Sequence, residues 1–195
     1  MRQLVPWESV SGTRLIRLTE MHVSDLSGAI RSIPDFPKPG ILFRDISPLL
    51  ESDELFQYTI DLLAGECNGY SLSKIIGLDA RGFIFGGALA YKLGIGFVPI
   101  RKKGKLPFRT LSQSYELEYG AAEFQIHEDS LAPEESVIIV DDLLATGGTA
   151  RAAIQLVEKL GARVKKVLFV MELEGLGGRA LLEPVEVGSL MKFPA

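Results

Sequence analysis

The segment Val137-Ile-Ile-Val-Asp-Asp-Leu-Leu-Ala-Thr-Gly-Gly-Thr149 decides the fold of this chain. Its first four residues are apolar, which is typical of a strand buried on both faces of a parallel sheet. A helix is expected from about Thr149 to Leu160, because apolar residues recur there at helical spacing and Gly161 follows as a stop. The segment therefore predicts a strand, a glycine-rich turn and a helix in direct succession.

The same order recurs along the chain. Apolar runs predict further strands, and a helix is expected from about Phe83 to Leu93, where Gly94 ends it. Alternating strands and helices favour an α/β fold, with a parallel sheet flanked by helices on both faces. The carboxyl ends of such strands meet at one edge, where ligands of open α/β sheets bind. The strands are expected at 74–78, 96–100, 137–140 and 164–171, and the turns at the ligand edge are 79–82, 101–105 and 141–149.

Two helices are expected before the first of these strands. The apolar residues of 26–33 fall on one helical face, and Pro34 ends that pattern. The prolines and the glycine of 34–40 then predict an irregular connection. Ser52 is a suitable N-cap for the second helix, which apolar spacing extends to about Cys67.

Composition and charge exclude several classes of protein. The 195 residues are 47% hydrophobic and 24% charged, which is ordinary for one globular domain and unlike a disordered chain. No apolar run approaches the roughly 18 residues that a membrane-spanning helix needs. Cys67 is the single cysteine, which excludes an internal disulfide and a cysteine-based zinc cluster. A formal net charge of −4 argues against a basic surface for nucleic acid.

Residues 1–20 differ from the rest of the chain. They carry arginines and glutamates but lack the apolar core of a secretory signal. An organelle transit peptide is the alternative, although acidic residues interrupt it. We expect an N-terminal extension over 1–20, with Met21 as an alternative start, and a single domain over 21–195. Because no targeting or membrane signal is recognised, we expect a cytoplasmic location.

The turn after Val140 carries groups suited to a phosphorylated ligand. Asp141 and Asp142 are paired carboxylates, which accept hydrogen bonds from vicinal hydroxyls such as those of a ribose, or hold a divalent cation through water. Small residues then let backbone N–H groups surround a phosphate, while threonine hydroxyls add donors. The positive end of the following helix dipole contributes about 0.3–1 kcal/mol. The loop residues are Ala145, Thr146, Gly147, Gly148 and Thr149.

Other phosphate-binding patterns differ from this segment. No lysine follows the glycines, so it is not a Walker A loop, and the absence of G-x-G-x-x-G disfavours a dinucleotide. A turn that only joins a strand to a helix is the structural alternative, and Gly-Gly-Thr alone would favour it. The complete segment resembles the signature for phosphoribosyl pyrophosphate (PRPP) in type I phosphoribosyltransferases. The resemblance implies that Asp141 and Asp142 bind the ribose hydroxyls and that 145–149 binds the 5′-phosphate of PRPP or AMP.

Four further segments narrow this resemblance to the adenine phosphoribosyltransferases, and it covers about residues 26–195. It implies the transfer of 5-phosphoribosyl from PRPP to adenine, with AMP and pyrophosphate as products. Mg²⁺ is the implied cofactor, held mainly by PRPP and water near Asp141 and Asp142 rather than by direct protein ligands. The segments are Pro39–Ile46, Gly77–Gly86, Arg101–Pro107 and Ser114–Gly120.

The resemblance also implies features of the architecture. It implies the type I phosphoribosyltransferase fold with a small hood over the base, formed by about 34–46 together with the C-terminal stretch. It implies a homodimer and a cis peptide bond between Asp79 and Ala80. Leu42, Arg44 and Leu173 would line the adenine pocket, whereas an ordinary surface arginine is the alternative interpretation of Arg44.

Five cations lie within nine residues at 101–109, and no acidic residue interrupts them. A solvated surface is the ordinary interpretation of such a run. This run follows a strand at the ligand edge, however, where a leaving pyrophosphate needs charge-assisted hydrogen bonds of about 1.5–3 kcal/mol each. The resemblance implies pyrophosphate contacts from four residues, partly across a dimer interface. They are Arg81, Arg101, Lys102 and Lys105.

The stretch Gly104–Gly120 is long and polar, so we expect a mobile loop. Adenine attacks through N9, and a carboxyl group near N7 would share the proton that the purine relocates. Glu118 is the expected catalytic residue, because it matches the family's Leu-Glu-Tyr-Gly. Glu116 is its competitor, and Tyr119 lies in the same loop.

Two alternative functions accompany this interpretation. A non-catalytic regulator with the same fold would sense PRPP and bind DNA, but no helix-turn-helix pattern and no net basic charge support it. A phosphoribosyltransferase for another purine base is the alternative among enzymes. We therefore expect adenine, PRPP, AMP and pyrophosphate as small-molecule partners, and neither nucleic acid nor a membrane.

Overall fold

The computed structural model describes residues 21–117 and 120–195, and the chain forms two compact units. The first unit ends at Thr59, and the second is Ile60–Ala195. The predicted extension over 1–20 lies outside the described residues. Along the part of the chain that the structure describes, no helix combines the length and apolarity that crossing a membrane requires.

The first unit contains a two-stranded antiparallel sheet next to short helices. Its register runs from Arg31 opposite Asp45 to Pro34 opposite Leu42. The predicted cap at Ser52 is confirmed, because its hydroxyl oxygen accepts a hydrogen bond of 3.2 Å from the backbone N–H of Leu55. The elements are α2 (Val23–Ala29), β1 (Arg31–Pro34), β2 (Leu42–Asp45), α3 (Ser47–Glu51) and α4 (Asp53–Gly65), whose last residues belong to the second unit.

The helix predicted through 26–33 is too long. It ends at Ala29, and Ile30 already has extended backbone angles, so Ile33 lies in β1. A residue that precedes proline is sterically disfavoured in the α region, and Ile33 precedes Pro34. The constraint acts on Ile33 alone, and the rest of Arg31–Pro34 is extended because it pairs with β2.

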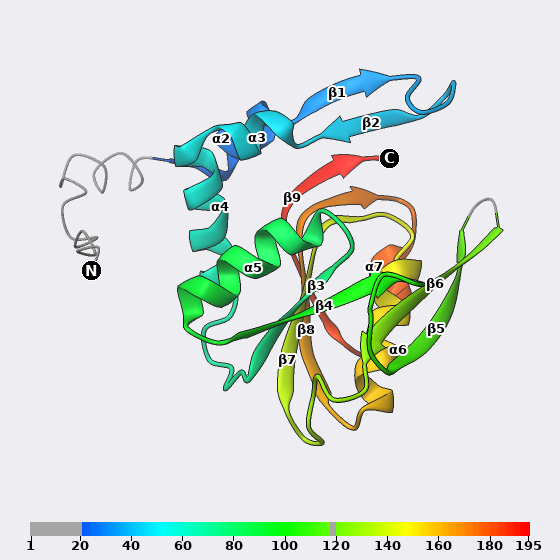
Figure 1. Ribbon diagram of the computed structural model, residues 1–195. Coiled ribbons are helices and arrows are strands. Elements are labelled where there is room, and N and C mark those ends of the chain that lie inside the picture. Colours follow the sequence, from blue (N-terminus) through cyan, green and yellow to red (C-terminus); the bar gives the residue numbers. More distant parts are fainter. Residues whose placement is uncertain (1–20, 118–119) are drawn as a thin grey trace, which may run out of the picture. The chain divides into compact units, whose positions relative to one another are not determined.

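The second unit is built on a seven-stranded sheet in the order β5-β6-β4-β3-β7-β8-β9 (Figure 1). Neighbouring strands within β4-β3-β7-β8-β9 pair in parallel, whereas β6 pairs antiparallel with both β4 and β5. The predicted parallel sheet is confirmed as a mixed, mostly parallel one. The elements are β3 (Lys74–Leu78), α5 (Gly82–Leu93), β4 (Gly96–Lys102), β5 (Thr110–Leu117), β6 (Gly120–His127), β7 (Ser136–Leu144), α6 (Gly148–Lys159), β8 (Arg163–Glu174), α7 (Gly178–Leu181) and β9 (Glu186–Pro194).

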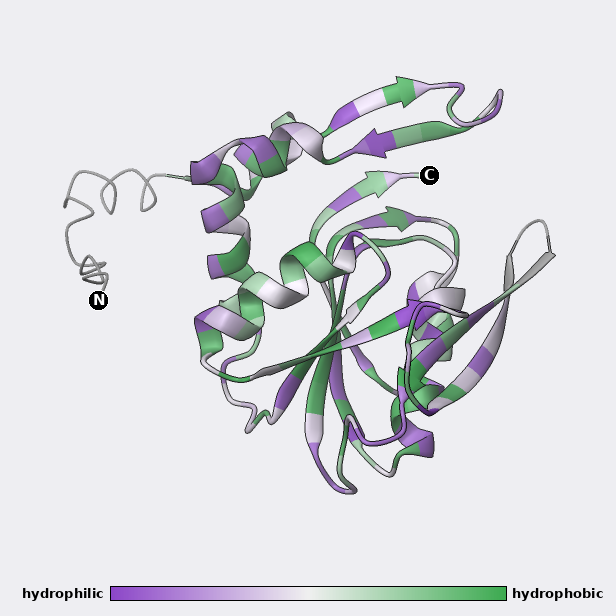
Figure 2. Ribbon diagram, in the orientation of Figure 1, coloured by the Kyte–Doolittle hydropathy of each residue, from purple (hydrophilic) through white to green (hydrophobic). Residues whose placement is uncertain are grey.

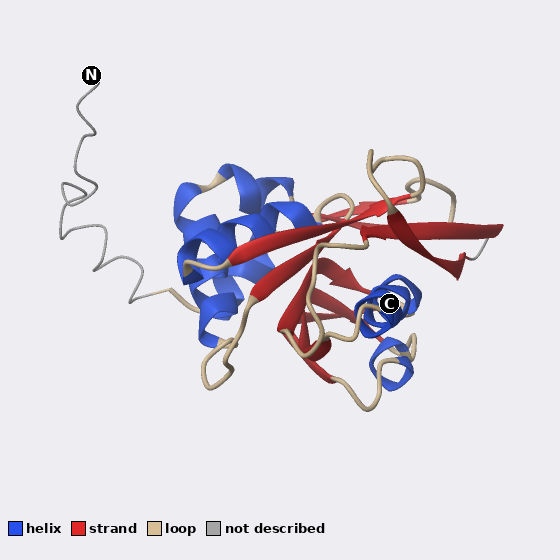
Figure 3. Ribbon diagram, turned by 60° about the horizontal axis from the view of Figure 1, so that its bottom comes forward, coloured by secondary structure: helices blue, strands red, loops and turns tan. Residues whose placement is uncertain are grey.

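Helices α5 and α6 cover opposite faces of this sheet (Figures 1 and 3). Gly86 of α5 packs against Gly77 and Phe97, whereas Ile76 belongs to the hydrophobic cluster that includes Ile154 of α6. Neighbouring residues of a strand point to opposite faces, so Gly77 and Ile76 mark the two sides. The central strands are the most hydrophobic part of the unit (Figure 2), and all of Val137–Val140 is buried, as predicted.

The loop expected at Gly104–Gly120 is wrong for most of its length, because Thr110–Leu117 is strand β5. Leu111 and Tyr115 alternate with polar residues along this strand, and the Tyr115 ring packs 4.8 Å from that of Phe124 on β6. This alternation is the ordinary signal of a half-buried antiparallel strand. The polar composition of the stretch had favoured a loop instead.

Candidate active site

Strand β7 and helix α6 are joined by the three residues 145–147, and this connection is the centre of the site. Gly147 has a φ of 85°, a backbone conformation that residues with a side chain rarely adopt. A Cβ at Gly147 would lie only 2.8 Å from the carbonyl oxygen of Gly178. The first backbone N–H groups of α6 have no partner within the helix, which leaves them available to an anion.

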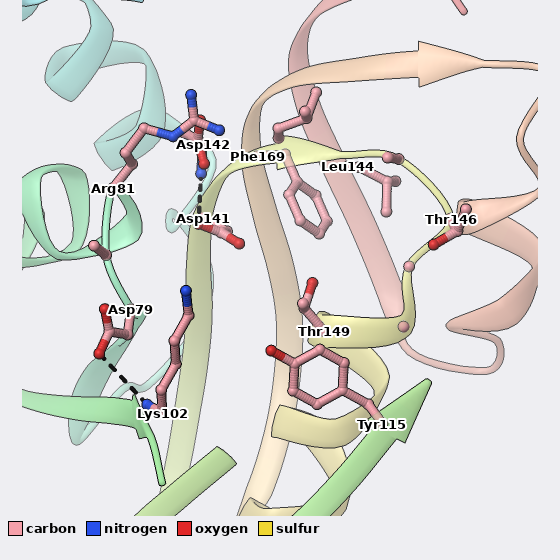
Figure 4. Close-up of a pocket in the computed structure, with 15 residues that line it drawn as sticks. Asp79, Arg81, Lys102, Tyr115, Asp141, Asp142, Leu144, Thr146, Thr149 and Phe169 are labelled. Carbon is pink, nitrogen blue, oxygen red and sulfur yellow. Dashed lines mark hydrogen bonds and ion pairs between the residues drawn. The ribbon is translucent and has the colours of Figure 1, made fainter. Parts of the chain in front are cut away.

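A cavity of about 700 Å³ opens at this connection. Its wall includes every residue predicted to bind PRPP, from Asp141 to Thr149, together with Arg81 and Lys102. Figure 4 shows Lys102 extending toward Asp141, with the hydroxyl groups of Tyr115 and Thr149 facing the same space. The carboxyl ends of separate strands thus meet at one cavity, as expected for a mostly parallel sheet.

Asp141 and Asp142 form an acidic pair at the wall of the cavity, with Asp142 buried and Asp141 partly exposed. Asp142 is only 4% exposed, and its Oδ2 lies 2.8 Å from Nε of Arg81. The backbone N–H of Asp142 donates a hydrogen bond of 2.9 Å to Oδ1 of Asp141. A Cβ at Gly82 would lie 2.8 Å from that Oδ1, so a glycine at this position lets the turn after β3 approach the pair.

Burial governs the protonation of these carboxyl groups. It raises the pKa of Asp141 well above the ordinary value of 3.8, and the charge of Asp142 raises it further. Burial also raises the pKa of Asp142, whereas the Arg81 guanidinium opposes that rise. A ligand that supplies hydroxyl donors or a cation would stabilise the charged pair, so the arrangement suits a polyhydroxylated, metal-associated molecule.

Only part of the basic run at 101–109 lines the cavity. Lys102 lines the cavity, but Arg101 and Lys105 are not among its lining residues. Arg101 Nε lies 3.4 Å from Oδ2 of Asp79, and its Nη1 donates a hydrogen bond of 3.1 Å to the carbonyl oxygen of Lys105. Its guanidinium also lies 5.9 Å from the ring centroid of Phe83. In this structure Arg101 therefore ties the basic turn to the end of β3.

The residues predicted to bind adenine are spread over the chain. Leu42 and Arg44 lie on β2 in the first unit, where Leu42 is 44% exposed and Arg44 Nη1 donates a hydrogen bond to the hydroxyl oxygen of Ser32. Leu173 lies near the end of β8 in the second unit and lines a different cavity, of about 550 Å³. Glu118 and Tyr119 lie outside the described residues.

Six residues that line the main cavity were not among the predicted site residues: Asp79, Ala80, Tyr115, Leu143, Leu144 and Phe169. The peptide bond between Asp79 and Ala80 is cis, as the resemblance implied. Burial, followed by the charges of Asp79 and Asp141, raises the pKa of Tyr115. In the sequence, Tyr115 and Phe169 resemble ordinary core aromatics. The only signal for Tyr115 is the alternation along β5, which indicates the face of the sheet on which its side chain lies.

Comparisons with known proteins agree with this geometry. Residues 50–179 match the model of the phosphoribosyl transferase domain family. The adenine phosphoribosyltransferase of Neorhizobium galegae is 54% identical over 170 residues, which cover 86% of this chain and 94% of that protein. The protein of the same name from Thermoanaerobacter sp. is 50% identical over 173 residues, covering 89% of this chain and 100% of its own length.

Solved structures give the same result. The crystal structure of adenine phosphoribosyltransferase from Thermoanaerobacter pseudethanolicus has a TM-score of 0.86 and 49% identity, covering 88% of this chain and 100% of that one. The enzyme from Saccharomyces cerevisiae, complexed with an imino-altritol bisphosphate and adenine, has a TM-score of 0.82 and 44% identity. That comparison covers 86% of this chain and 97% of the yeast chain.

Proposed function

The chain belongs to the adenine phosphoribosyltransferase family, and on this premise we propose that its 700 Å³ cavity binds PRPP. It is a glycosyltransferase of purine salvage, which transfers 5-phosphoribosyl from PRPP to adenine and releases pyrophosphate with AMP. The observation that supports the proposed site is the β7–α6 connection, where a glycine turn at the start of a helix and two adjacent carboxylates share one cavity wall.

The 5′-phosphate of PRPP is proposed to bind residues 145–149. Backbone N–H groups at the start of α6 and the hydroxyls of Thr146 and Thr149 donate to its oxygens, while the helix dipole favours its charge. Gly147 lets the backbone turn without a Cβ that would collide with Gly178. The phosphate thereby fixes one end of the substrate, which positions C1′ for attack.

Asp141 and Asp142 receive the ribose hydroxyls. Ribose O–H groups replace water as donors to carboxylates that burial has deprived of solvent. Among the described residues, no group of three or more histidine, cysteine, aspartate or glutamate side chains is placed to hold a metal ion. Two adjacent carboxylates can hold a divalent cation through water, which suits Mg²⁺ that is held mainly by PRPP and water. When bound, Mg²⁺ supplies positive charge to the oxygens of the leaving pyrophosphate.

Positive side chains stabilise that leaving group. Arg81 and Lys102 line the cavity and can donate to pyrophosphate oxygens. Lys105 follows on the same turn, and Arg101 holds this turn through Asp79. As pyrophosphate departs, C1′ gains oxocarbenium character, so catalysis rests mostly on positioning and on charge stabilisation.

Leu42, Arg44 and Leu173 are the proposed adenine-binding residues, as the family resemblance implies for a hood over the base. Glu118 is the proposed catalytic residue, because a carboxyl group near N7 shares the proton that moves as N9 bonds to C1′. Tyr119 is the next residue in the sequence. We propose that closure of the segment that carries these two residues excludes water that otherwise hydrolyses PRPP.

A homodimer in the cytoplasm completes the proposal. Ile84 and Tyr91 are seven residues apart, which puts them on the same face of α5, and they are 41% and 90% exposed. Exposed apolar side chains on one face favour an interface between copies of the chain. The cytoplasmic location stays a prediction from the sequence.

An assay with several bases tests the proposed function directly. Pyrophosphate release from PRPP and Mg²⁺ would be measured with adenine, hypoxanthine, guanine, xanthine and orotate. We expect release with adenine and little with the other bases. Release with another purine alone would assign a different base specificity. Specific DNA binding without release would favour the PRPP-sensing regulator.

A further inference from the structure

A glycine turn at Gly177–Gly178 contacts the phosphate-binding loop, and neither glycine is among the residues that line the PRPP cavity. Gly178 begins α7, which lies beside α6 (Figure 1). A Cβ at Gly178 would lie 2.1 Å from the carbonyl oxygen of Ala145, and a Cβ at Gly147 would lie 2.8 Å from the carbonyl oxygen of Gly178. The two backbones therefore touch with no side chain between them, and neither can move without moving the other.

Arg179, the next residue, fixes this turn to the sheet. Its Nη2 lies 2.5 Å from Oε2 of Glu172, and its Nε lies 3.2 Å from Oε1 of the same carboxylate. Its Nη1 donates a hydrogen bond of 2.6 Å to the carbonyl oxygen of Val187, and Nη2 donates one of 3.2 Å to Ser189. A guanidinium held on two strands in this way has one available orientation.

Glu172 depends on this arrangement in turn. Its side chain is only 9% exposed, and the hydroxyl of Ser189 donates a second hydrogen bond, of 2.7 Å, to Oε2. Hydrogen bonding to Arg179 lowers the pKa of Glu172, which keeps the carboxylate charged. The next residue along β8 is Leu173. One ion pair therefore anchors both the turn behind the phosphate loop and the strand end that carries a proposed adenine contact.

We infer that Arg179 is a positioning residue for PRPP, acting with Glu172 to press the Gly177–Gly178 turn against the phosphate-binding loop. The inference rests on the proposed function of residues 145–149. Arg179 is not among the residues that line the PRPP cavity, so it acts through the backbone of Gly178 and Gly147. Without the ion pair, the turn gains freedom and the N–H groups of the loop lose their fixed spacing, which weakens phosphate binding before it slows chemistry.

The test compares PRPP binding and turnover in Arg179→Met, Arg179→Lys and Glu172→Gln. The matched control is Arg163→Met, which removes an exposed arginine–glutamate pair with Glu134 at the opposite end of β8. We expect Arg179→Met to raise the Kd and KM for PRPP about tenfold while kcat at saturating PRPP changes little. Arg179→Lys and Glu172→Gln should fall between this variant and the wild type, and Arg163→Met should bind PRPP normally.

A second variant keeps the ion pair and disturbs only the contact. Gly178→Ala places a methyl group against the carbonyl of Ala145, so it should weaken PRPP binding with Arg179 intact. Folding is checked by the melting temperature of each ligand-free variant. If Arg179→Met fails to fold, Glu172→Gln and Gly178→Ala decide the question.

Titration of the wild type with PRPP distinguishes failure of this inference from failure of the proposed function. If the wild type binds PRPP and Thr149→Val weakens that binding, the proposed site holds. Folded Arg179 or Glu172 variants that then bind PRPP like the wild type overturn the inference alone. If the wild type does not bind PRPP, the proposed function fails, and the inference fails with it.

Discussion

The β7–α6 segment and the β5–β6 hairpin both contribute to the cavity, but they are built in opposite ways. Strand β7 is buried on both faces and ends in a turn whose backbone contacts Gly178. The hairpin is an antiparallel ribbon at the edge of the sheet, with one apolar row that includes Tyr115. The comparison separates a rigid region suited to binding phosphate from an edge region suited to covering the reaction.

The hairpin should therefore control turnover. We predict that Glu118→Ala lowers kcat by about 10²–10⁴-fold, because the proton on the purine loses its acceptor. PRPP affinity should change only modestly. Steady-state kinetics with adenine would measure this, and Glu116→Ala is the matched control on the same strand end. Near-normal kcat in Glu118→Ala would remove the role of this residue without affecting the PRPP site.

The phosphate loop should instead control binding. We predict that Gly147→Ala weakens PRPP binding at least about tenfold, because the new Cβ collides with the Gly178 carbonyl. Calorimetric titration would measure it, beside the melting temperature without ligand. Gly94→Ala is the control, since Gly94 also has a positive φ, of 67°, but no atom within 4 Å of a Cβ. Equal PRPP affinity in Gly147→Ala and the wild type would contradict the assignment.

Strand β2, which carries Arg44, allows adenine binding to be tested separately from PRPP binding. Arg44 lies in the first unit, apart in sequence from the phosphate loop and the hairpin. We predict that Arg44→Ala raises the KM for adenine about tenfold, as expected for the loss of one charged hydrogen bond. PRPP binding should stay near normal. If both substrates are affected equally in initial-rate measurements, Arg44 does not belong to the base pocket.

The smallest expected effect concerns stability. The folded-state pKa of Asp141 is raised by burial, so ionisation of this group opposes folding. Its favourable contribution is complete below the ordinary pKa of 3.8 and is lost as pH rises through the folded-state pKa. Asp141→Asn should therefore melt higher than the wild type at neutral pH, by roughly 2–4 °C for each kcal/mol gained.

The control for this prediction is the pH dependence itself. The difference in melting temperature between Asp141→Asn and the wild type should shrink as pH falls toward 3.8, where both side chains are neutral. PRPP binding should weaken in the same variant, because an amide is a poorer acceptor for ribose hydroxyls. A variant that melts lower than the wild type at neutral pH would show that burial does not destabilise the charged form.

The sequence predicted the phosphate loop well, because a buried strand, a turn and a helix start occupy one continuous segment. All seven residues from Asp141 to Thr149 that were expected to bind PRPP line the cavity. Gly94 also ends α5 in the left-handed conformation expected of it. Local patterns of this kind need no knowledge of distant residues.

Contacts between distant residues were not predictable in the same way. Nothing in the sequence pairs Arg81 with Asp142, or turns Arg101 toward Asp79. The edge strand β5 was missed because its polar residues outweighed the alternation of Leu111 and Tyr115. The helix expected through Ile33 was wrong because Arg31–Pro34 pairs with the distant strand β2, and the constraint from Pro34 keeps Ile33 extended.

A crystal structure with PRPP and Mg²⁺ tests the central claim most directly. We predict that the 5′-phosphate lies within hydrogen-bond distance of backbone N–H groups between Ala145 and Thr149, with the ribose hydroxyls at Asp141 and Asp142. A 5′-phosphate bound anywhere else, or a ribose turned away from the two aspartates, would contradict the account.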